Sequence, residues 1–430
     1  MRLEDFDYDL PPELVAQYPP PQRADARMLV VHRSNGTFED GDFQRLPEYL
    51  NPGDLLVVNN SRVLPARLFG HRLGLRSQPI GKRNPGRGQY LTSAIEVLLT
   101  RQLDERTWEA LVRPGRKVRV GERLVFSRTA GDQECLSGRV GGSDSESPRA
   151  GVPIASRFDP GGRDRDRRGG DVKEAAPVAV AKETGRVAEM ESDSLHRCDT
   201  LEAEVIGRGE FGIRILRFPE GISVPEMLER VGHVPLPPYI HRLEEELDRQ
   251  RYQTVYASRP GSVAAPTAGL HFTEQMLSAL ECAGIERVEI TLHVGLGTFQ
   301  PIHTAQIEQH HLHSESFQVT PEAAARLNQT LAEKRRIVAV GTTTVRTLEH
   351  LAALHGGRIE PGSGETQLFI WPGYQFRVVG GLLTNFHLPR TTLLMLVAAF
   401  AGRELILAAY EHAVRERYRF YSYGDCTLIL

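Results

Sequence analysis

The chain has 430 residues, enough for two or three domains with buried cores. Hydrophobic residues make up 40% of it and charged residues 25%, which is ordinary for a soluble globular protein. The formal net charge of −3 argues against a protein that coats nucleic acid through bulk positive charge, although it leaves room for a local basic patch.

The sequence predicts a cytoplasmic protein. Its longest apolar stretch, near Leu393–Phe400, is too short to span a bilayer, and its acidic first ten residues do not resemble a signal peptide. The four cysteines lie far apart and form no CxxC pair: Cys135, Cys198, Cys282 and Cys426. We therefore expect reduced thiols, without a disulfide framework or a structural zinc ion.

Predicted strands dominate the first half of the chain. Asp54–Asn60 reads as a buried strand that follows an Asn-Pro-Gly turn. Six further strand-like runs are separated by glycine, proline or charged turns: Ala66–Gly70, Ile95–Arg101, Thr107–Val112, Glu122–Phe126, Leu201–Gly207 and Gly212–Phe218. Short strands at this spacing predict a small β-barrel or sandwich.

Two insertions interrupt this region. Gly138–Thr200 spans 63 residues, of which nine are Leu, Ile, Val or Phe, and Phe158 is its only aromatic residue. Such a segment buries too little to offset the entropy of ordering, so we expect a disordered insertion. With 11 basic and 12 acidic residues it is a polyampholyte rather than a basic arm. A smaller Gly/Arg/Pro-rich insertion covers Arg76–Gln89.

The second half of the chain, from Pro225 onward, alternates helices with strands. The expected helices are Thr273–Ala283 with Thr273 as its cap, Pro321–Lys334, Leu393–Ala409 and Glu411–Tyr418, and the expected strands are Val288–Val294 and Ile337–Gly341. The predicted fold class is therefore a mixed α/β domain, residues 1–65 and 220–430, with a small β-barrel domain inserted at residues 66–219. The long insertion, residues 138–200, lies within the barrel.

Polar and glycine-rich islands lie between the apolar elements, where a rigid scaffold commonly presents functional residues. The islands are Asn59–Arg62, Gly232–Pro235, Ala264–Phe272, His293–Phe299, His310–Glu315, Gly341–Arg346, Thr384–Pro389 and Tyr421–Asp425.

Taken singly, each island has two interpretations. Gly295–Gly297 is a ligand loop or only a tight turn, and it does not complete the GxGxxG pattern of a dinucleotide fold. Gly341–Thr344 either presents backbone N–H groups to an anion or ribose, or simply starts a helix. Arg346 either binds substrate or makes a structural ion pair. His310, His311 and His313 suggest a metal, but few carboxylates lie nearby and no second cluster has ligand spacing, so we predict none.

Taken together, the islands resemble the S-adenosylmethionine:tRNA ribosyltransferase-isomerase family of queuosine biosynthesis. The segments that carry the resemblance are Asp5–Pro19, Gly53–Arg67, Arg230–Ile240, Arg251–Tyr256, Gly261–Thr273, Thr291–Phe299, Asn385–Val397 and Arg417–Leu430. It covers everything except the two insertions, and the long one is not typical of the family. Five single residues also depart from the family pattern: Ser61, Leu312, Gln367, Thr391 and Cys426.

The resemblance implies a specific reaction. Such enzymes use S-adenosylmethionine as a ribosyl donor, not a methyl donor, and consume it as a substrate without a further cofactor. The acceptor is the aminomethyl group of 7-aminomethyl-7-deazaguanine at the tRNA wobble position. The products are epoxyqueuosine-tRNA, adenine and methionine. The family fold is an α/β domain with an inserted β-barrel, and we expect a monomer.

This chemistry needs a base near the ribose C5′, a hydrogen-bond donor at the departing adenine, and a group that takes a proton from the amine. The candidate catalytic residues are His271, His387, Asp425 and Glu315. Our hypothesis is that His271 or His387 is the base and that Asp425 lies near the sulfonium or the amine. The candidate substrate-binding residues are Asn60, Arg62, Thr267, Phe272, His293, Gly295, Gly297, Thr298, Thr343, Arg346, Asn385 and Tyr423.

Two other classes of protein compete with this reading. A methyltransferase would use the same co-substrate, but the chain has no GxG loop after an early strand. A non-catalytic RNA-binding module would not need so many His- and Asp-containing loops, and no RNA-recognition aromatic motif is present.

The charge is unevenly distributed. Arg62–Arg119 contains 13 basic and four acidic residues, so the predicted barrel domain is basic and the rest of the chain acidic. A basic barrel suits phosphate contacts that position a tRNA, whereas the alternative is a solvated basic face. The candidate tRNA contacts are Arg67, Arg113, Arg116 and Lys117.

Overall fold

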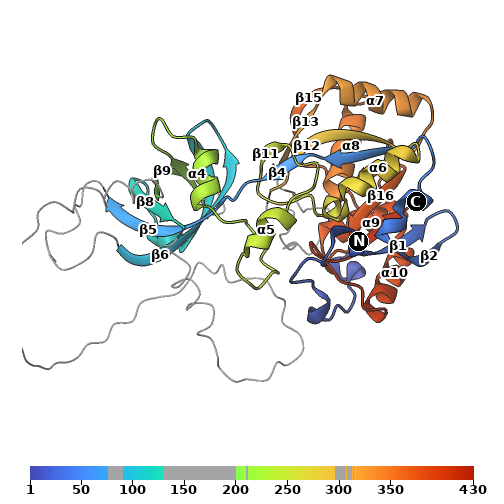
Figure 1. Ribbon diagram of the computed structural model, residues 1–430, viewed down its shortest axis with the longest axis horizontal. Helices are drawn as coiled ribbons and strands as arrows, with labels where there is room; N and C mark the ends of the chain where they lie inside the picture. The colour runs from blue at the N-terminus through green and yellow to red at the C-terminus, as the bar shows by residue number, and fades with distance from the viewer. Residues whose placement is uncertain (76–90, 129–199, 210–211, 296–306, 308–311, 313) are drawn as a thin grey trace, which may run out of the picture.

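The computed structural model describes residues 1–75, 91–128, 200–209, 212–295, 307, 312 and 314–430. It shows an α/β body and a smaller β-barrel side by side, joined by a narrow connection (Figure 1). The predicted fold class is confirmed. The predicted disordered insertion, Gly138–Thr200, and the smaller insertion, Arg76–Gln89, lie outside the described residues, apart from Thr200, which begins a barrel strand and pairs with Ser127.

A nine-stranded sheet forms the centre of the body, in the order β15-β13-β12-β3-β14-β16-β17-β1-β2. Its strands are β1 Arg27–His32, β2 Thr37–Asp42, β3 Leu55–Asn59, β12 Glu286–His293, β13 Glu315–Val319, β14 Ile337–Val340, β15 Gly362–Thr366, β16 Gly381–Asn385 and β17 Cys426–Ile429. The central strands β12, β3, β14 and β16 are parallel. The strands β3, β14 and β16 are buried on both faces, as expected when helices cover both sides of a sheet.

Helices cover the two faces of the sheet unequally. Leu55, Val57 and Ala339 point into a core formed with α7, α8, α9 and α10. Leu56 and Val58 point into the opposite core, formed with α1 and α6. This alternation follows from the two-residue period of a strand. The helix bounds are α1 Leu46–Tyr49, α6 Glu274–Cys282, α7 Pro321–Ala332, α8 Thr342–Leu354, α9 Thr392–Ala401 and α10 Arg403–Arg415.

The inserted domain is a closed six-stranded barrel in the order β10-β7-β6-β5-β8-β9. Its strands are β5 Arg67–Leu75, β6 Leu91–Gln102, β7 Thr107–Arg113, β8 Glu122–Ser127, β9 Thr200–Arg208 and β10 Ile213–Arg217. Trp108, Phe126 and Phe218 fill its interior, and α4 (Val224–Val231) packs Val224 and Leu228 into the same core.

The chain crosses between body and barrel at two adjoining places. The two-stranded sheet of β4 (Ser61–Val63) and β11 (Arg259–Ser262) marks the junction, and α5 (Glu246–Arg251) lies beside it (Figure 1). At the barrel's edge, Arg67 and His233 form an isolated antiparallel bridge. Short 3-10 turns complete the path: η1 Leu3–Phe6, η2 Pro12–Leu14, η3 Arg23–Asp25, η4 Phe43–Arg45, η5 Gly115–Lys117 and η8 Thr267–His271.

Two helix predictions have opposite outcomes. The Thr273 cap is confirmed, because its side chain accepts a hydrogen bond from the Met276 N–H at 3.1 Å. The single helix Leu393–Ala409 is wrong, because Gly402 adopts φ 94° and separates α9 from α10.

Among the described residues, no single helix is long and apolar enough to cross a membrane. Only α9 and α10 taken together reach the required length and apolar composition, and they bend by 116° at their break.

Candidate active site

A pocket opens at the carboxyl ends of the parallel strands β12, β14 and β16. In sequence order the chain moves from β12, on one side of β3, to β14, on its other side, so this is a switch point where open α/β sheets bind ligands. The pocket is lined by Ala265, Pro266, Thr267, Ala268, Val294, Gly341, Thr342, Thr343, Thr384, Asn385, Phe386, His387, Leu393, Tyr421 and Ser422. Five of the predicted islands therefore meet here.

The lining mixes apolar side chains with hydroxyl, amide and imidazole groups, and none of these residues is an acid, a lysine or an arginine. The start of α8 contributes a positive local field, because Gly341 and the first two helical residues, Thr342 and Thr343, line the pocket. Gly341 adopts φ 91° and supplies no side-chain cap, and the first turn contains no acidic residue. Peptide N–H groups at such a terminus lack intrahelical partners and favour an anion.

The Asn385 side chain is oriented by its neighbours. Its Nδ2 donates to the Tyr421 carbonyl oxygen at 3.0 Å and lies 3.3 Å from His271 Nε2. A carbonyl only accepts hydrogen bonds, so the amide nitrogen must be the atom that faces Tyr421. The other amide atom, Oδ1, is buried and has no hydrogen-bond partner in the described chain. An acceptor without a donor beside a pocket indicates a ligand group.

His271 lies behind Asn385 and is absent from the pocket lining. Its ring packs against Phe43, with the ring centroids 5.4 Å apart, and only 2% of the residue is exposed. Burial lowers the pKa of His271 to about 4, so the imidazole is neutral near pH 7. Because Nε2 accepts from Asn385, this nitrogen is already in use.

His387 does line the pocket. Its Nε2 lies 3.1 Å from Thr384 Oγ1, and its backbone is held by Tyr8, whose hydroxyl donates to the His387 carbonyl oxygen at 2.5 Å, and by Tyr410. Burial lowers the pKa of His387 to about 3. The imidazole is therefore neutral and can accept a proton from a bound substrate.

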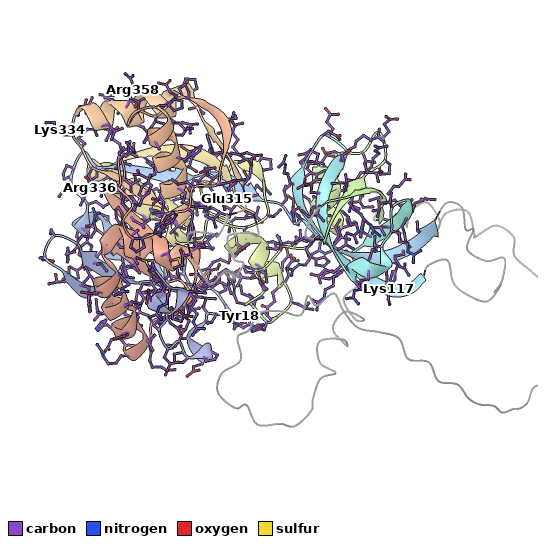
Figure 2. The ribbon with its side chains drawn as sticks, turned by 180° about the vertical axis from the view of Figure 1, so that it is seen from behind. Tyr18, Lys117, Glu315, Lys334, Arg336 and Arg358 are labelled. Carbon is purple, nitrogen blue, oxygen red and sulfur yellow. The ribbon has the colours of Figure 1, made fainter. Side chains whose placement is uncertain are left out.

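Glu315 and Arg346 form a buried ion pair that links β13 to α8. Neither residue lines the pocket. Figure 2 shows Glu315 on the side of the body that faces the barrel. Arg346 therefore has the structural ion pair that was one of its two predicted interpretations.

Asp425 holds the C-terminal loop together. Its Oδ2 accepts from the Arg419 N–H at 2.7 Å and its Oδ1 from the Arg27 N–H at 3.0 Å. Burial raises the pKa of the Asp425 carboxyl, although the backbone donors oppose this. The structure places Asp425 outside the pocket lining.

Tyr423 also turns away from the pocket. Its hydroxyl donates to Asp248 Oδ1 at 2.7 Å, and Arg242 holds the same carboxylate with bonds of 2.6 and 2.8 Å. Arg242 and Asp248 belong to the segment that returns from the barrel. The neighbouring loop residue Ser422 bonds to Tyr239 of that segment. The segment that returns from the barrel therefore stabilises the loop that supplies Tyr421 and Ser422 to the pocket.

The remaining predicted residues divide into five groups. Thr267, Thr343 and Asn385 line the pocket, whereas Phe272 lies in the core beside α6. Asn60 stabilises the sheet, because its side chain forms hydrogen bonds with Glu289 and with Thr291 Oγ1. His293 and Gly295 flank the pocket residue Val294, and burial lowers the pKa of His293. Gly297, Thr298 and Phe299 lie outside the described residues, as do His310, His311 and His313.

The predicted tRNA contacts differ in how far their side chains are exposed. Arg113, Arg116 and Lys117 are exposed at the end of β7 and in η5, and Figure 2 shows Lys117 at the edge of the barrel. Arg67 is half-buried: its Nη2 donates to the Leu236 carbonyl oxygen at 2.9 Å and its Nε lies 3.4 Å from Glu96. Arg62 is exposed at the junction and lies 3.5 Å from Glu229.

Sequence reasoning missed several lining residues. Thr342, Thr384, Tyr421 and Ser422 stood inside the predicted islands without being selected, so the islands themselves were the available signal. Tyr239, which supports Ser422, lies in the segment Arg230–Ile240 that carries the family resemblance, but nothing in the sequence marked it individually. Within the described ranges, no group of three His, Cys, Asp or Glu side chains is arranged to hold a metal ion.

Comparison with known proteins agrees over the whole chain. The family model described as "Queuosine biosynthesis protein" matches residues 3–151 and 169–429. Proteins named S-adenosylmethionine:tRNA ribosyltransferase-isomerase from Solibacter usitatus and Moorella thermoacetica are 47% and 45% identical, and each alignment covers 100% of both chains. A crystal structure of S-adenosylmethionine tRNA ribosyltransferase from Thermotoga maritima is 33% identical, covers 99% of this chain and 100% of its own, and has a TM-score of 0.46.

Proposed function

The chain belongs to the queuosine biosynthesis protein family, and on this premise we propose that it transfers and isomerises the ribosyl moiety of S-adenosylmethionine onto tRNA. The acceptor is the aminomethyl group of 7-aminomethyl-7-deazaguanine at the wobble position. The products are epoxyqueuosine-tRNA, adenine and methionine. Its full-length relatives are named as transferase-isomerases, and the chain is an enzyme of this class.

One observation carries the proposal. The islands that carry the family resemblance, although distant in sequence, converge on a single pocket at the switch point of the sheet. A structural role alone does not require polar loops from five separate segments to face one cavity.

We assign the base at the ribose C5′ to His387 rather than His271. Both imidazoles are neutral, but only His387 lines the pocket. His271 instead accepts the Asn385 amide and fixes its direction, so it is a positioning residue. The proton that His387 removes is the one that the adjacent sulfonium acidifies, and a positioned base of this kind contributes about 10²- to 10⁴-fold.

We place the tRNA on the barrel, through the exposed cations Arg113, Arg116 and Lys117. Contacts of this kind are made to phosphates and set position rather than sequence preference. The wobble base must then reach the pocket across the junction. Tyr239 and Asp248, which belong to the connection, support the pocket loop from that side.

Incubation of the chain with 7-aminomethyl-7-deazaguanine tRNA and S-adenosylmethionine tests the function directly. The nucleosides are then examined by mass, and the small molecules by chromatography. Epoxyqueuosine with free adenine and methionine is the expected result. S-adenosylhomocysteine would instead show a methyltransferase, and binding without turnover would show an RNA-binding module.

The assignment of the base has its own test. His387→Gln should abolish adenine release while preserving binding of S-adenosylmethionine. His271→Gln should retain turnover with a raised KM, because it disturbs only Asn385. Near-normal turnover of the His387→Gln variant would refute the assignment.

A further inference from the structure

Two binding groups of opposite character meet in the pocket. The start of α8 offers peptide N–H donors and the positive end of a helix dipole, on a helix of 13 residues. Asn385, which lines the pocket and is only 3% exposed, has a buried Oδ1 acceptor without a partner among the described residues. A ligand that satisfies both must present an anion and a hydrogen-bond donor close together.

We propose that this pocket binds the α-amino acid head of S-adenosylmethionine, with the carboxylate at the N-terminus of α8 and the ammonium group donating to Asn385 Oδ1. The proposal rests on the proposed function and names the part of the substrate that this site holds. The carboxylate is the only anionic group of S-adenosylmethionine. The ammonium is bonded to the same carbon, so one small site can hold both.

The size of the pocket favours the head over the nucleoside. The cavity has a volume of about 50 Å³, which suits a compact polar group better than an adenosine. Two methylene groups join the head to the sulfonium sulfur, and C5′ is the next atom beyond it. With the head anchored at α8, C5′ is only four covalent bonds from the α-carbon, which keeps it within reach of His387 in the pocket lining.

A phosphate of the tRNA is the competing anion. It would match the helix terminus equally well, because both groups are oxyanions. A phosphodiester, however, has no donor for Asn385 Oδ1, and that atom cannot turn away because the Tyr421 carbonyl fixes the amide. A buried acceptor left unsatisfied destabilises the complex, so the amino acid head fits better.

Decarboxylated S-adenosylmethionine tests the carboxylate contact. It keeps the sulfonium and the amine but lacks the anion. At saturating modified tRNA we expect adenine release with a KM about 10- to 100-fold higher than for S-adenosylmethionine, because the charge-assisted hydrogen bonds are lost. Equal kcat/KM for the two compounds would overturn the subsite while leaving the proposed function intact.

A variant pair separates charge from shape. Thr343→Asp places a carboxylate on the same N–H groups, where it also favours the helix, and Thr343→Asn is its neutral match. Relative to the Asn variant, the Asp variant should raise KM for S-adenosylmethionine about tenfold and change that for the decarboxylated compound by less than about threefold. A raised KM for tRNA alone would instead identify a phosphate site and overturn the proposal.

Equilibrium dialysis keeps the two hypotheses distinct. Labelled S-adenosylmethionine and its decarboxylated form are each dialysed against the wild-type chain with tRNA that lacks the aminomethyl acceptor, so that neither compound is consumed. Tighter binding of the carboxylate form supports the subsite even if modified tRNA then gives no adenine release, and that combination would refute the proposed function alone. Equal binding of the two compounds would refute the subsite.

Discussion

Lowering the pH from 7.5 to 5.0 should destabilise the α/β body through its two buried imidazoles. His271 and His387 are neutral in the folded chain, with pKa values of about 4 and about 3, and both pKa values are lowered mainly by burial. In the unfolded chain each returns to about 6.5. Because the folded pKa is the lower one, the stabilisation is complete above pH 6.5 and is lost as the pH falls toward the folded pKa.

The expected loss follows from these values. At pH 5.0 an unfolded histidine is almost fully protonated, whereas the folded His271 and His387 are not. Each therefore removes about 2 kcal/mol of unfolding free energy between pH 7.5 and 5.0, or about 4 kcal/mol together. The lowered pKa of His293 acts in the same direction. The raised pKa of Asp425 acts in the opposite sense.

The two tryptophans allow the body to be measured alone. Trp108 is buried in the barrel and Trp371 packs against the body core, so Trp108→Phe leaves a single reporter of body unfolding. Urea unfolding followed by fluorescence at several pH values gives the slope of stability against pH. Adding His387→Gln should remove about half of that slope, whatever its effect on stability at pH 7.5.

A flat profile between pH 7.5 and 5.0 would refute this reasoning. So would an unchanged slope in the His387→Gln variant, since the slope would then arise from other groups. The comparison uses slopes rather than absolute stabilities, so a variant that is merely less stable does not mimic the result.

Three further predictions concern the hydrogen bond to Asp248, the long insertion and the exposed cations of the barrel. Tyr423→Phe removes one hydrogen bond from the buried Asp248 carboxylate, so it should lower the unfolding free energy by about 1.5–3 kcal/mol and raise KM for S-adenosylmethionine, as measured by urea unfolding and adenine release. Replacing residues 138–199 by a short Gly-Ser linker should leave turnover largely intact, because Ser127 and Thr200 already pair across the base of this insertion. Changing Arg113, Arg116 and Lys117 together to alanine should weaken tRNA binding. The slope of the logarithm of the binding constant against the logarithm of salt concentration should also become shallower, by the equivalent of about two to three phosphate contacts. Filter binding at several salt concentrations measures both effects.

Each of these predictions has a contrary outcome. A normal KM in Tyr423→Phe would separate the Asp248 cluster from the pocket loop. Severe loss of folding after the deletion would show that the insertion contributes to the core. Arg358→Ala is the matched control for the tRNA variant, because Arg358 is exposed and lies on the part of the body away from the barrel (Figure 2). Equal weakening by this control would exclude the barrel as the contact surface.

Periodicity and turn chemistry predicted much of the fold. The barrel strands could be predicted because each is a short apolar run followed by glycine, proline or charged residues. The cap of α6 could be predicted because a threonine precedes the first helical turn. The break at Gly402 was missed because the apolar pattern continues through it. Only the left-handed backbone of that glycine, at φ 94°, ends α9.

The site was located more reliably than its residues were assigned. The islands marked the loops, but the side of a loop that faces a cavity depends on tertiary structure. In the C-terminal loop, Tyr421 adopts φ 76°, and Tyr421 and Ser422 face the pocket while Tyr423 and Asp425 bond to the scaffold. Sequence reasoning selected Tyr423 as a substrate-binding residue and Asp425 for its titratable carboxylate. No local pattern distinguishes the two directions.

The position of β17 in the sheet bears on how the chain folds as it is synthesised. Among the described strands, the β1–β2 hairpin, made first, joins the rest of the sheet only through β17, which lies between β1 and β16. The hairpin therefore waits until residues 426–429 have left the ribosome. The barrel strands are complete by residue 217 and α4, which packs into the barrel core, by residue 231, so this domain needs no such delay. The pocket loop that precedes β17 is also synthesised late, so the enzyme gains its site in the same late step that closes its sheet.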